Sequence, residues 1–198
     1  MAATGGPGAA GDTDGPSGAG RIEFRPFARA DLPLLGRWLG APHVARWWPR
    51  EDASAAALDA HYGPAIDGTD PTRLFLIAVD GAPAGFCEAY LHADEPAWDR
   101  AVGLPNVAGI DYLIGDPGLC GNGLGTRIIA AFCDVVFGLY PGACGIASVP
   151  QAANPASRRV LEKNGFQLVE VRTVESEDPG DAGPAAVYLL PRGAAASR

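Results

Sequence analysis

Three glycines alternate at Gly121, Gly123 and Gly125, where an apolar run ends and a helical repeat begins. Alternating glycines let the backbone approach a ligand closely, and unpaired N–H groups at a helix N-terminus favour negative charge. The loop therefore suggests phosphate binding. No lysine follows it as in a P-loop, and its spacing differs from the dinucleotide-binding G-x-G-x-x-G pattern. An ordinary strand-to-helix turn has the same glycines, so the loop alone leaves both interpretations open.

Aromatic and acidic residues stand at two further places where chemistry is possible. Trp47 and Trp48 are adjacent in a predicted loop that Pro49 ends. Two adjacent indoles cannot both point inward, so we expect one to face a cleft; the alternative is that the pair fills the core. Glu88 interrupts an apolar strand segment, and it either lines an acceptor site or alternates out to solvent.

The composition limits the partners of the chain. The 198 residues suit one compact domain, and the formal net charge of −8 disfavours nucleic acid and attracts cations. No apolar run reaches the roughly 18–20 residues of a membrane span, so we expect no membrane partner. Residues 1–20 read as a disordered tail without a secretory signal, 21–191 as the domain and 192–198 as a flexible tail.

The four cysteines form no C-x-x-C pair and have no histidine at metal-ligand spacing. We therefore expect no metal site and a reduced, cytoplasmic protein. The three histidines, His43, His61 and His92, are expected at the surface without a catalytic role.

The elements that must position these residues follow the order β-α-α-β-β-β-α-β-α-β-β. Asp80-Gly81 is the strongest hairpin signal, and the polar segment 92–106 reads as a loop. Asp31 and Asp52 stand where helix caps are expected. The predicted strands are 21–27, 74–79, 84–91, 107–114, 143–149, 166–173 and 185–190, and the predicted helices are 32–39, 55–62, 126–137 and 154–163.

The glycine loop and the segment 154–166, NPASRRVLEKNGF, together resemble the two signature motifs of the GNAT acyltransferase superfamily over residues 21–190. The resemblance implies an α/β (α+β) fold, with a mixed, mostly antiparallel sheet flanked by helices and split at the acetyl-CoA site. It implies that backbone N–H groups of the loop bind the pyrophosphate and that two strand residues pair with the pantetheine arm. The implied cofactor-binding residues are Leu113, Ile114, Cys120, Gly121, Asn122, Gly123, Leu124, Gly125, Thr126 and Asn154.

Two positions depart from the family pattern. Relatives often have Arg or Gln where this chain has Cys120, so one side-chain contact to phosphate is lost. A tyrosine that can protonate the departing CoA thiolate often stands where this chain has Leu161. Either Tyr112, Tyr90 or water replaces it, or the thiolate leaves unprotonated, which its pKa near 8.5 allows.

Within the superfamily, segments 43–48, 108–114 and 121–137 resemble aminoglycoside 6'-N-acetyltransferases, which implies a cationic polyamine acceptor, direct transfer in a ternary complex and a role in antibiotic resistance. Such an acceptor requires carboxylates for its ammonium groups and an aromatic wall for its rings. The resemblance makes Asp111 the catalytic residue that orients the amine; otherwise Asp111 pairs with an arginine or caps a turn. The implied substrate-binding residues are Trp47, Trp48, Glu88, Tyr90, Asp111 and Asp181.

Other acceptors remain open at this stage. Relatives often carry an acidic residue where this chain has Val149, so one ammonium contact is missing. The double tryptophan also occurs in lysine or hydroxylysine acyltransferases of siderophore pathways, and segment 157–163 resembles protein N-terminal acetyltransferases. A non-catalytic acyl-CoA-binding module is the fourth alternative. The sequence allows a monomer or a homodimer.

Overall fold

The computed structural model describes residues 20–49, 52–176 and 183–193, which form a seven-stranded sheet in the order β1-β2-β3-β4-β5-β7-β6. All neighbouring strands are antiparallel except β4 and β5, which are parallel. This confirms the predicted fold class. The strands are β1 (Ile22–Pro26), β2 (Arg73–Val79), β3 (Ala82–Leu91), β4 (Val107–Ile114), β5 (Gly145–Ser148), β6 (Gln167–Thr173) and β7 (Pro184–Pro191).

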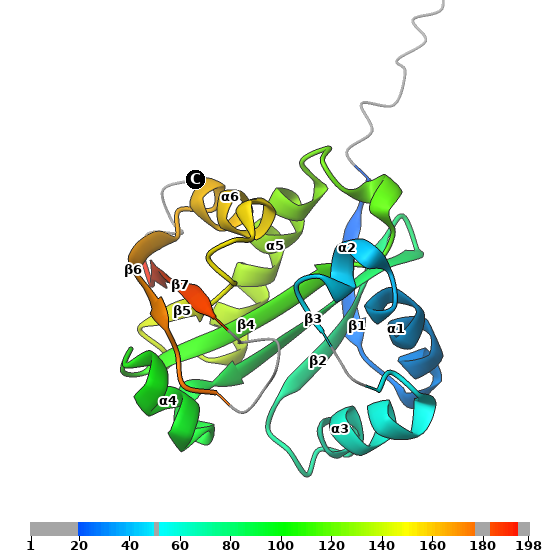
Figure 1. Ribbon diagram of the computed structural model, residues 1–198, viewed down its shortest axis with the longest axis horizontal. Coiled ribbons are helices and arrows are strands. Elements are labelled where there is room, and N and C mark those ends of the chain that lie inside the picture. Colours follow the sequence, from blue (N-terminus) through cyan, green and yellow to red (C-terminus); the bar gives the residue numbers. More distant parts are fainter. Residues whose placement is uncertain (1–19, 50–51, 177–182, 194–198) are drawn as a thin grey trace, which may run out of the picture.

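Helices cover both faces of the sheet, with α1, α2 and α3 in front and α5 behind in the view of Figure 1. Strand alternation explains the two cores, because consecutive side chains point to opposite faces. Leu76 and Phe86 pack with the front helices, whereas their neighbours Ile77 and Cys87 pack with α5 and α6. The helices are α1 (Leu32–Leu39), α2 (Pro42–Ala45), α3 (Ala55–Asp67), α4 (Pro96–Val102), α5 (Leu124–Leu139) and α6 (Pro155–Lys163).

The β2–β3 hairpin turns at Asp80 and Gly81, as predicted. Both residues have positive φ, 51° and 79°, which a two-residue turn that matches the strand twist requires. This turn pairs β3 with β2, and β3 pairs on its other edge with β4, where Glu88 stands opposite Asp111.

Four local predictions were wrong. The segment 92–106, predicted as a loop, contains α4. Val102 of this helix is buried against Val174 and Val187, so tertiary packing stabilises a helix that the polar sequence does not predict. Segment 42–49 contains the short helix α2.

The predicted cap of α3 was also wrong, since Ser54, not Asp52, accepts the Ala57 N–H at 3.3 Å. Likewise, the carboxylate of Asp31 makes no cap bond to α1. It pairs with Arg25 at 2.7 Å instead, and this ion pair lowers the pKa of the Asp31 carboxyl.

The sheet splits between β4 and β5. These strands pair only from Val107 to Gly109, and the Ser148 hydroxyl then donates to the Ile110 carbonyl at 3.2 Å. Beyond that point β4 runs on to Ile114 without β5 beside it. Its free edge is the place where a further extended chain can pair with the backbone.

Backbone alternation shows which residues of β4 face the split. The Gly115 N–H donates to the Ala84 carbonyl at 2.9 Å, toward β3. Alternate residues of an antiparallel strand turn their backbone groups to the same neighbour, so Leu113 also faces β3 while Tyr112 and Ile114 face the split. The backbone groups of Leu113 therefore pair with β3, and the pantetheine contacts expected of Leu113 and Ile114 both remain predictions.

In the described parts of the chain, no helix is both long and apolar enough to cross a membrane.

Candidate active site

An open cleft of about 420 Å³ lies where the front helices, the sheet and the β4–β5 split meet. It unites most of the predicted acceptor residues: Trp47, Trp48, Glu88, Tyr90 and Asp111 all line it. Asp181 lies outside the described residues. The other lining residues are His61, Tyr62, Ala65, Asp70, Thr72, Leu74, Glu95, Trp98, Tyr112, Ser148, Val149, Pro150, Gln151, Asn154, Ser157 and Ser176.

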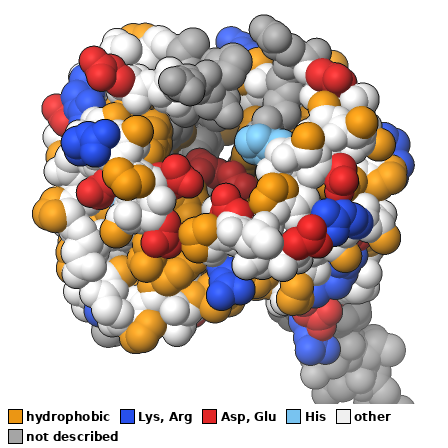
Figure 2. All heavy atoms as spheres, turned by 90° about the horizontal axis from the view of Figure 1, so that it is seen from below, with side chains coloured by type: hydrophobic (Ala, Val, Ile, Leu, Met, Phe, Trp, Pro, Cys, Tyr) orange, Lys and Arg blue, Asp and Glu red, His pale blue; other side chains and the backbone are white. Residues whose placement is uncertain are grey.

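Carboxylates dominate the charge of this cleft. Glu88 and Asp111 stand opposite each other on β3 and β4, so their side chains leave the same face of the sheet. Asp70 and Glu95 add a carboxylate from each side, and no lysine or arginine is found among the described lining residues. Acidic side chains gather around the hollow in Figure 2. The cleft suits a ligand with several positive charges.

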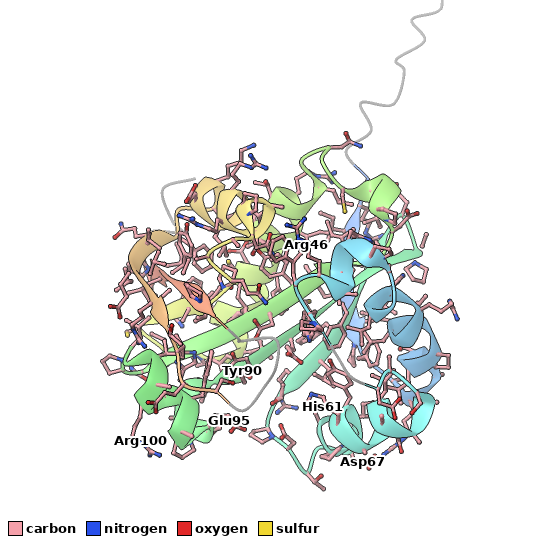
Figure 3. The ribbon with its side chains drawn as sticks, viewed as in Figure 1. Arg46, His61, Asp67, Tyr90, Glu95 and Arg100 are labelled. Atoms are coloured by element: carbon pink, nitrogen blue, oxygen red, sulfur yellow. The ribbon has the colours of Figure 1, made fainter. Side chains whose placement is uncertain are left out.

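Aromatic rings form the walls. Both Trp47 and Trp48 line the cleft, whereas their adjacency alone predicted one, and Trp48 also packs edge-on against Phe86 with ring centroids 6.2 Å apart. His61, from α3, and Glu95, just before α4, lie on opposite sides of the cleft in Figure 3. Flat rings beside carboxylates are a suitable surface for the apolar faces of a cationic sugar or cyclitol.

Tyr90 connects the acidic floor to a buried aromatic stack. Its hydroxyl donates to Oδ2 of Asp111 at 3.1 Å, and its ring lies over Gly109, where an added Cβ would be 2.5 Å from ring carbons. Behind it, His92 stacks on Tyr90 with ring centroids 5.8 Å apart and an interplanar angle of 14°. The stack holds Tyr90, and through it the Asp111 carboxylate, in one orientation.

His92 corrects the expectation that all three histidines lie at the surface. Only 1% of its surface is exposed, and neither ring nitrogen has a hydrogen-bond partner among the described residues. Burial lowers the pKa of His92 to about 4, so the imidazole is neutral near pH 7. The ring of the neighbouring Trp98 packs edge-on against His92, and this packing buries a position that the polar sequence around it predicted at the surface.

The opposite side of the cleft carries two hydroxyls at the N-terminus of α6. Tyr112 and Ser157 are joined by a hydrogen bond of 2.8 Å between their side-chain oxygens. Burial raises the pKa of Tyr112 well above its ordinary value. Leu161 is fully buried in the core one turn further along. Asn154, predicted to contact the cofactor, lines the cleft and also caps α6, since its Oδ1 accepts the Ser157 N–H at 3.2 Å.

The glycine loop lies apart from this cleft, at the far end of the split. Gly121 and Gly123 have φ of 84° and 79°, and a Cβ added at either would meet nothing within 4 Å. These positions therefore require glycine for their backbone conformation and leave an open side. A Cβ at Gly125 would lie 3.5 Å from Ile114, which places the start of α5 against the end of β4. Cys120 and Asn122 are exposed beside it.

This arrangement fits the phosphates and arm of acetyl-CoA. Unpaired N–H groups at the start of α5 are suited to phosphate, and the free edge of β4 leads from there to the cleft. When bound, acetyl-CoA supplies an activated acetyl thioester. The roles of the individual loop residues remain predictions.

Sequence reasoning missed several lining residues that tertiary contacts bring to the cleft. Asp70 is fixed because its Oδ1 accepts the Thr72 N–H at 2.8 Å, a turn motif that the Asp-Pro-Thr sequence hints at. Glu95 and Trp98 belong to the α4 region, which was read as a loop, so no helical face signalled them. His61 and Tyr62 were placed on a helix but not assigned to the site.

A family model described as an acetyltransferase (GNAT) domain matches residues 28–174. Two curated relatives, both named aminoglycoside N(6')-acetyltransferase type 1, come from Klebsiella pneumoniae and Serratia marcescens. Each is 29% identical over 173 residues, which cover 85% of this chain and 82% of the relative.

Solved structures agree. The crystal structure of the aminoglycoside acetyltransferase AAC(6')-Ib with coenzyme A is 26% identical, covers 88% of this chain and 96% of its own, and has a TM-score of 0.74. Its complex with coenzyme A and kanamycin is 27% identical, with the same coverage and TM-score. The motif match, the split sheet and these likenesses together show that this chain belongs to the GNAT acetyltransferase family and uses acetyl-CoA as its acyl donor.

Proposed function

We propose that this protein transfers the acetyl group of acetyl-CoA to the 6'-amine of an aminoglycoside. The observation that carries the proposal is the acidic, aromatic-walled cleft, whose described lining residues include four carboxylates, Asp70, Glu88, Glu95 and Asp111, and no lysine or arginine. The likeness to relatives named for this reaction supports it.

The acceptor amine must be held and must react without its proton. Asp111, fixed by the Tyr90 hydroxyl, is placed to bind the ammonium group and to orient the nitrogen toward the split. A carboxylate with an ordinary pKa near 4 is a weak base for an ammonium, so its larger contribution is positioning. Glu88 opposite it offers a second acceptor for the N–H groups.

Transfer occurs directly in a ternary complex: the amine nitrogen bonds to the acetyl carbon, the carbon–sulfur bond breaks, and the amine proton passes to solvent or Asp111. Leu161 is buried and apolar, so it donates nothing to the sulfur. The raised pKa of Tyr112 makes it a hydrogen-bond donor rather than a proton source. The sulfur leaves as a thiolate, which a thiol pKa near 8.5 permits.

Acceptor specificity follows from the remaining carboxylates. Asp70 and Glu95 come from opposite sides of the cleft and are suited to ammonium groups far from the reacting amine. Val149 lines the same cleft without charge, which narrows the range of drugs that bind tightly. When this protein is expressed in a susceptible bacterium, we expect a rise in the minimal inhibitory concentration of the aminoglycoside that the protein acetylates fastest.

The test is release of the CoA thiol by purified protein with acetyl-CoA and a panel of amines: kanamycin, tobramycin, gentamicin, lysine, hydroxylysine and a peptide with N-terminal alanine. We expect release with kanamycin and tobramycin that is lost when a hydroxyl replaces the 6'-amine. Release with lysine derivatives or the peptide alone would refute the aminoglycoside acceptor. Acetyl-CoA binding with no release would refute catalysis.

The matched variant is Asp111→Ala. We expect turnover to fall at least about 100-fold, in the range of a positioned acid–base group, while the acetyl-CoA dissociation constant stays unchanged. Asp134→Asn, at an exposed carboxylate of α5, is the control and keeps full activity.

A further inference from the structure

Arg46 is a cation supported by an indole. It follows α2 directly, its side chain is exposed, and its guanidinium carbon lies 4.6 Å from the centroid of the Trp47 ring. No carboxylate among the described residues pairs with it, whereas Arg25, Arg29 and Arg172 each hold an ion pair. The indole face fixes the direction of the guanidinium and leaves its N–H groups available.

The helix α2 is fastened to the end of β4 at the split. His43 Nε2 lies 3.0 Å from the Ile114 carbonyl oxygen. Just before α2, the Trp38 indole packs on Gly115 so closely that an added Cβ would be 2.2 Å from it. These two contacts set the position of α2 relative to the strand edge where the acetyl-CoA arm is expected.

Arg46 lies on the side of α2 that faces this edge. It follows His43 by three residues and keeps helical dihedral angles, φ −61° and ψ −32°, so the two side chains are neighbours on one side of the helix. Ile114, which His43 contacts, in turn lies against the start of α5. In Figure 3, Arg46 lies between α2 and the α5–α6 pair.

We propose that Arg46 binds a phosphate group of acetyl-CoA from the α2 side of the split. Residues 120–126 of the loop supply N–H groups but no full positive charge, and Arg127, which follows them, donates to the Gly20 carbonyl. A guanidinium held on an indole suits bidentate hydrogen bonding to phosphate oxygens. The proposal rests on the family's use of acetyl-CoA and is independent of the proposed acceptor.

The charge of the cleft separates this role from acceptor binding. Arg46 is not among the residues that line the acceptor cleft, whose ionised groups are carboxylates. A polycationic acceptor is repelled by a guanidinium, whereas the phosphates of the donor are attracted to it in a chain of net charge −8. The charge of Arg46 therefore suits the anionic cosubstrate and not a cationic acceptor.

Calorimetric titration of the full chain with CoA, without any acceptor, tests the proposal. Arg46→Ala and Arg46→Gln are expected to raise the CoA dissociation constant by about 5- to 20-fold, because an exposed charge-assisted contact is lost. Arg46→Lys keeps the charge but not the planar guanidinium, so the dissociation constant should rise less than in Arg46→Ala. The control is Arg37→Ala, an exposed arginine on neighbouring α1, which should stay within about twofold of wild type.

The difference between wild type and Arg46→Ala should shrink as ionic strength rises, since salt screens an exposed pair. Repeating the titration with 3'-dephospho-CoA shows which phosphate is bound. If Arg46 binds the pyrophosphate, Arg46→Ala still raises the dissociation constant of 3'-dephospho-CoA. If Arg46 binds the 3'-phosphate, this increase disappears. Thermal midpoints without ligand confirm that each variant is folded.

An unchanged CoA dissociation constant in folded Arg46→Ala overturns the proposal, as does an equal loss in Arg37→Ala. A change confined to the acceptor KM, with CoA binding intact, assigns Arg46 to the acceptor side and also overturns it. Because no acceptor is present in the titration, failure of the aminoglycoside proposal leaves this result interpretable.

Discussion

The hydroxyl of Tyr90 donates a hydrogen bond to Oδ2 of Asp111 at 3.1 Å, joining a carboxylate of the cleft to a ring on which His92 stacks from behind. The two residues lie on neighbouring strands, β3 and β4, which pair antiparallel. The contact uses one lone pair of the carboxylate and fixes its rotamer, so the other oxygen keeps a defined direction in the cleft.

Tyr90→Phe keeps the ring and removes this bond. We expect kcat with the best amine to fall by about tenfold, because the carboxylate loses its orientation, while acetyl-CoA affinity is unchanged. Steady-state kinetics and calorimetry measure the two effects. Tyr140→Phe is the matched control, since it removes a tyrosine hydroxyl bond to the Ala89 carbonyl outside the cleft. Equal activity of wild type and Tyr90→Phe would show that the bond does not position Asp111.

Gly123→Val tests the phosphate loop. A β-branched residue at φ 79° is strained, and its side chain occupies the open side of the loop. We expect the acetyl-CoA dissociation constant to rise at least about tenfold. In Gly138→Ala, on the same helix with nothing within 4 Å of an added Cβ, the dissociation constant should not change. Normal binding by a folded Gly123→Val variant would contradict the loop assignment.

Val149→Asp adds a carboxylate to the cleft. Val149 is half-buried, lines the cleft and packs against the cluster of Val102 and Val187. We expect KM for an aminoglycoside to fall about three- to tenfold through a new ammonium contact, with about 1 kcal/mol lost in folding stability. The neutral isostere Val149→Asn shows the packing cost alone. If both variants have the same KM, the gain is not electrostatic and the predicted contact is absent.

His92 makes folding stability depend on pH. Its pKa is about 4 in the folded protein and 6.5 when unperturbed, so between these values the unfolded chain binds a proton that the folded chain does not. The free energy of unfolding therefore falls as pH drops, by about 2 kcal/mol from pH 7.5 to pH 5 through this residue. The nearby Asp99 carboxylate opposes the shift only in part.

His92→Phe keeps a ring for Tyr90 to stack on and removes the titration. Urea unfolding at pH 7.5 and pH 5 should show a smaller loss in the variant than in wild type. An identical loss in both proteins would mean that other groups carry the pH dependence.

What the sequence by itself determined is local. The Asp80-Gly81 turn, the glycine loop and the strand alternation depend on backbone conformations and periods that neighbouring residues set, and the structure contains all three. The resemblance of the motifs predicted the GNAT family, and the match to the family model confirms it. Glu88 was found as an acidic interruption of an apolar strand and Asp111 through the resemblance, and the register brings the two face to face.

Only the tertiary structure decided how the cleft is closed and what is buried. The segment 92–106 contains α4 because Val102 packs against Val174, Ala185 and Val187 and because Arg172, on β6, donates to the Ala101 and Val102 carbonyls. That packing brings Glu95 and Trp98 to the cleft and buries His92 behind Tyr90. These hydrogen bonds join residues about 70 positions apart in the sequence. Burial and charge pairing by such distant residues cannot be predicted from a local sequence pattern.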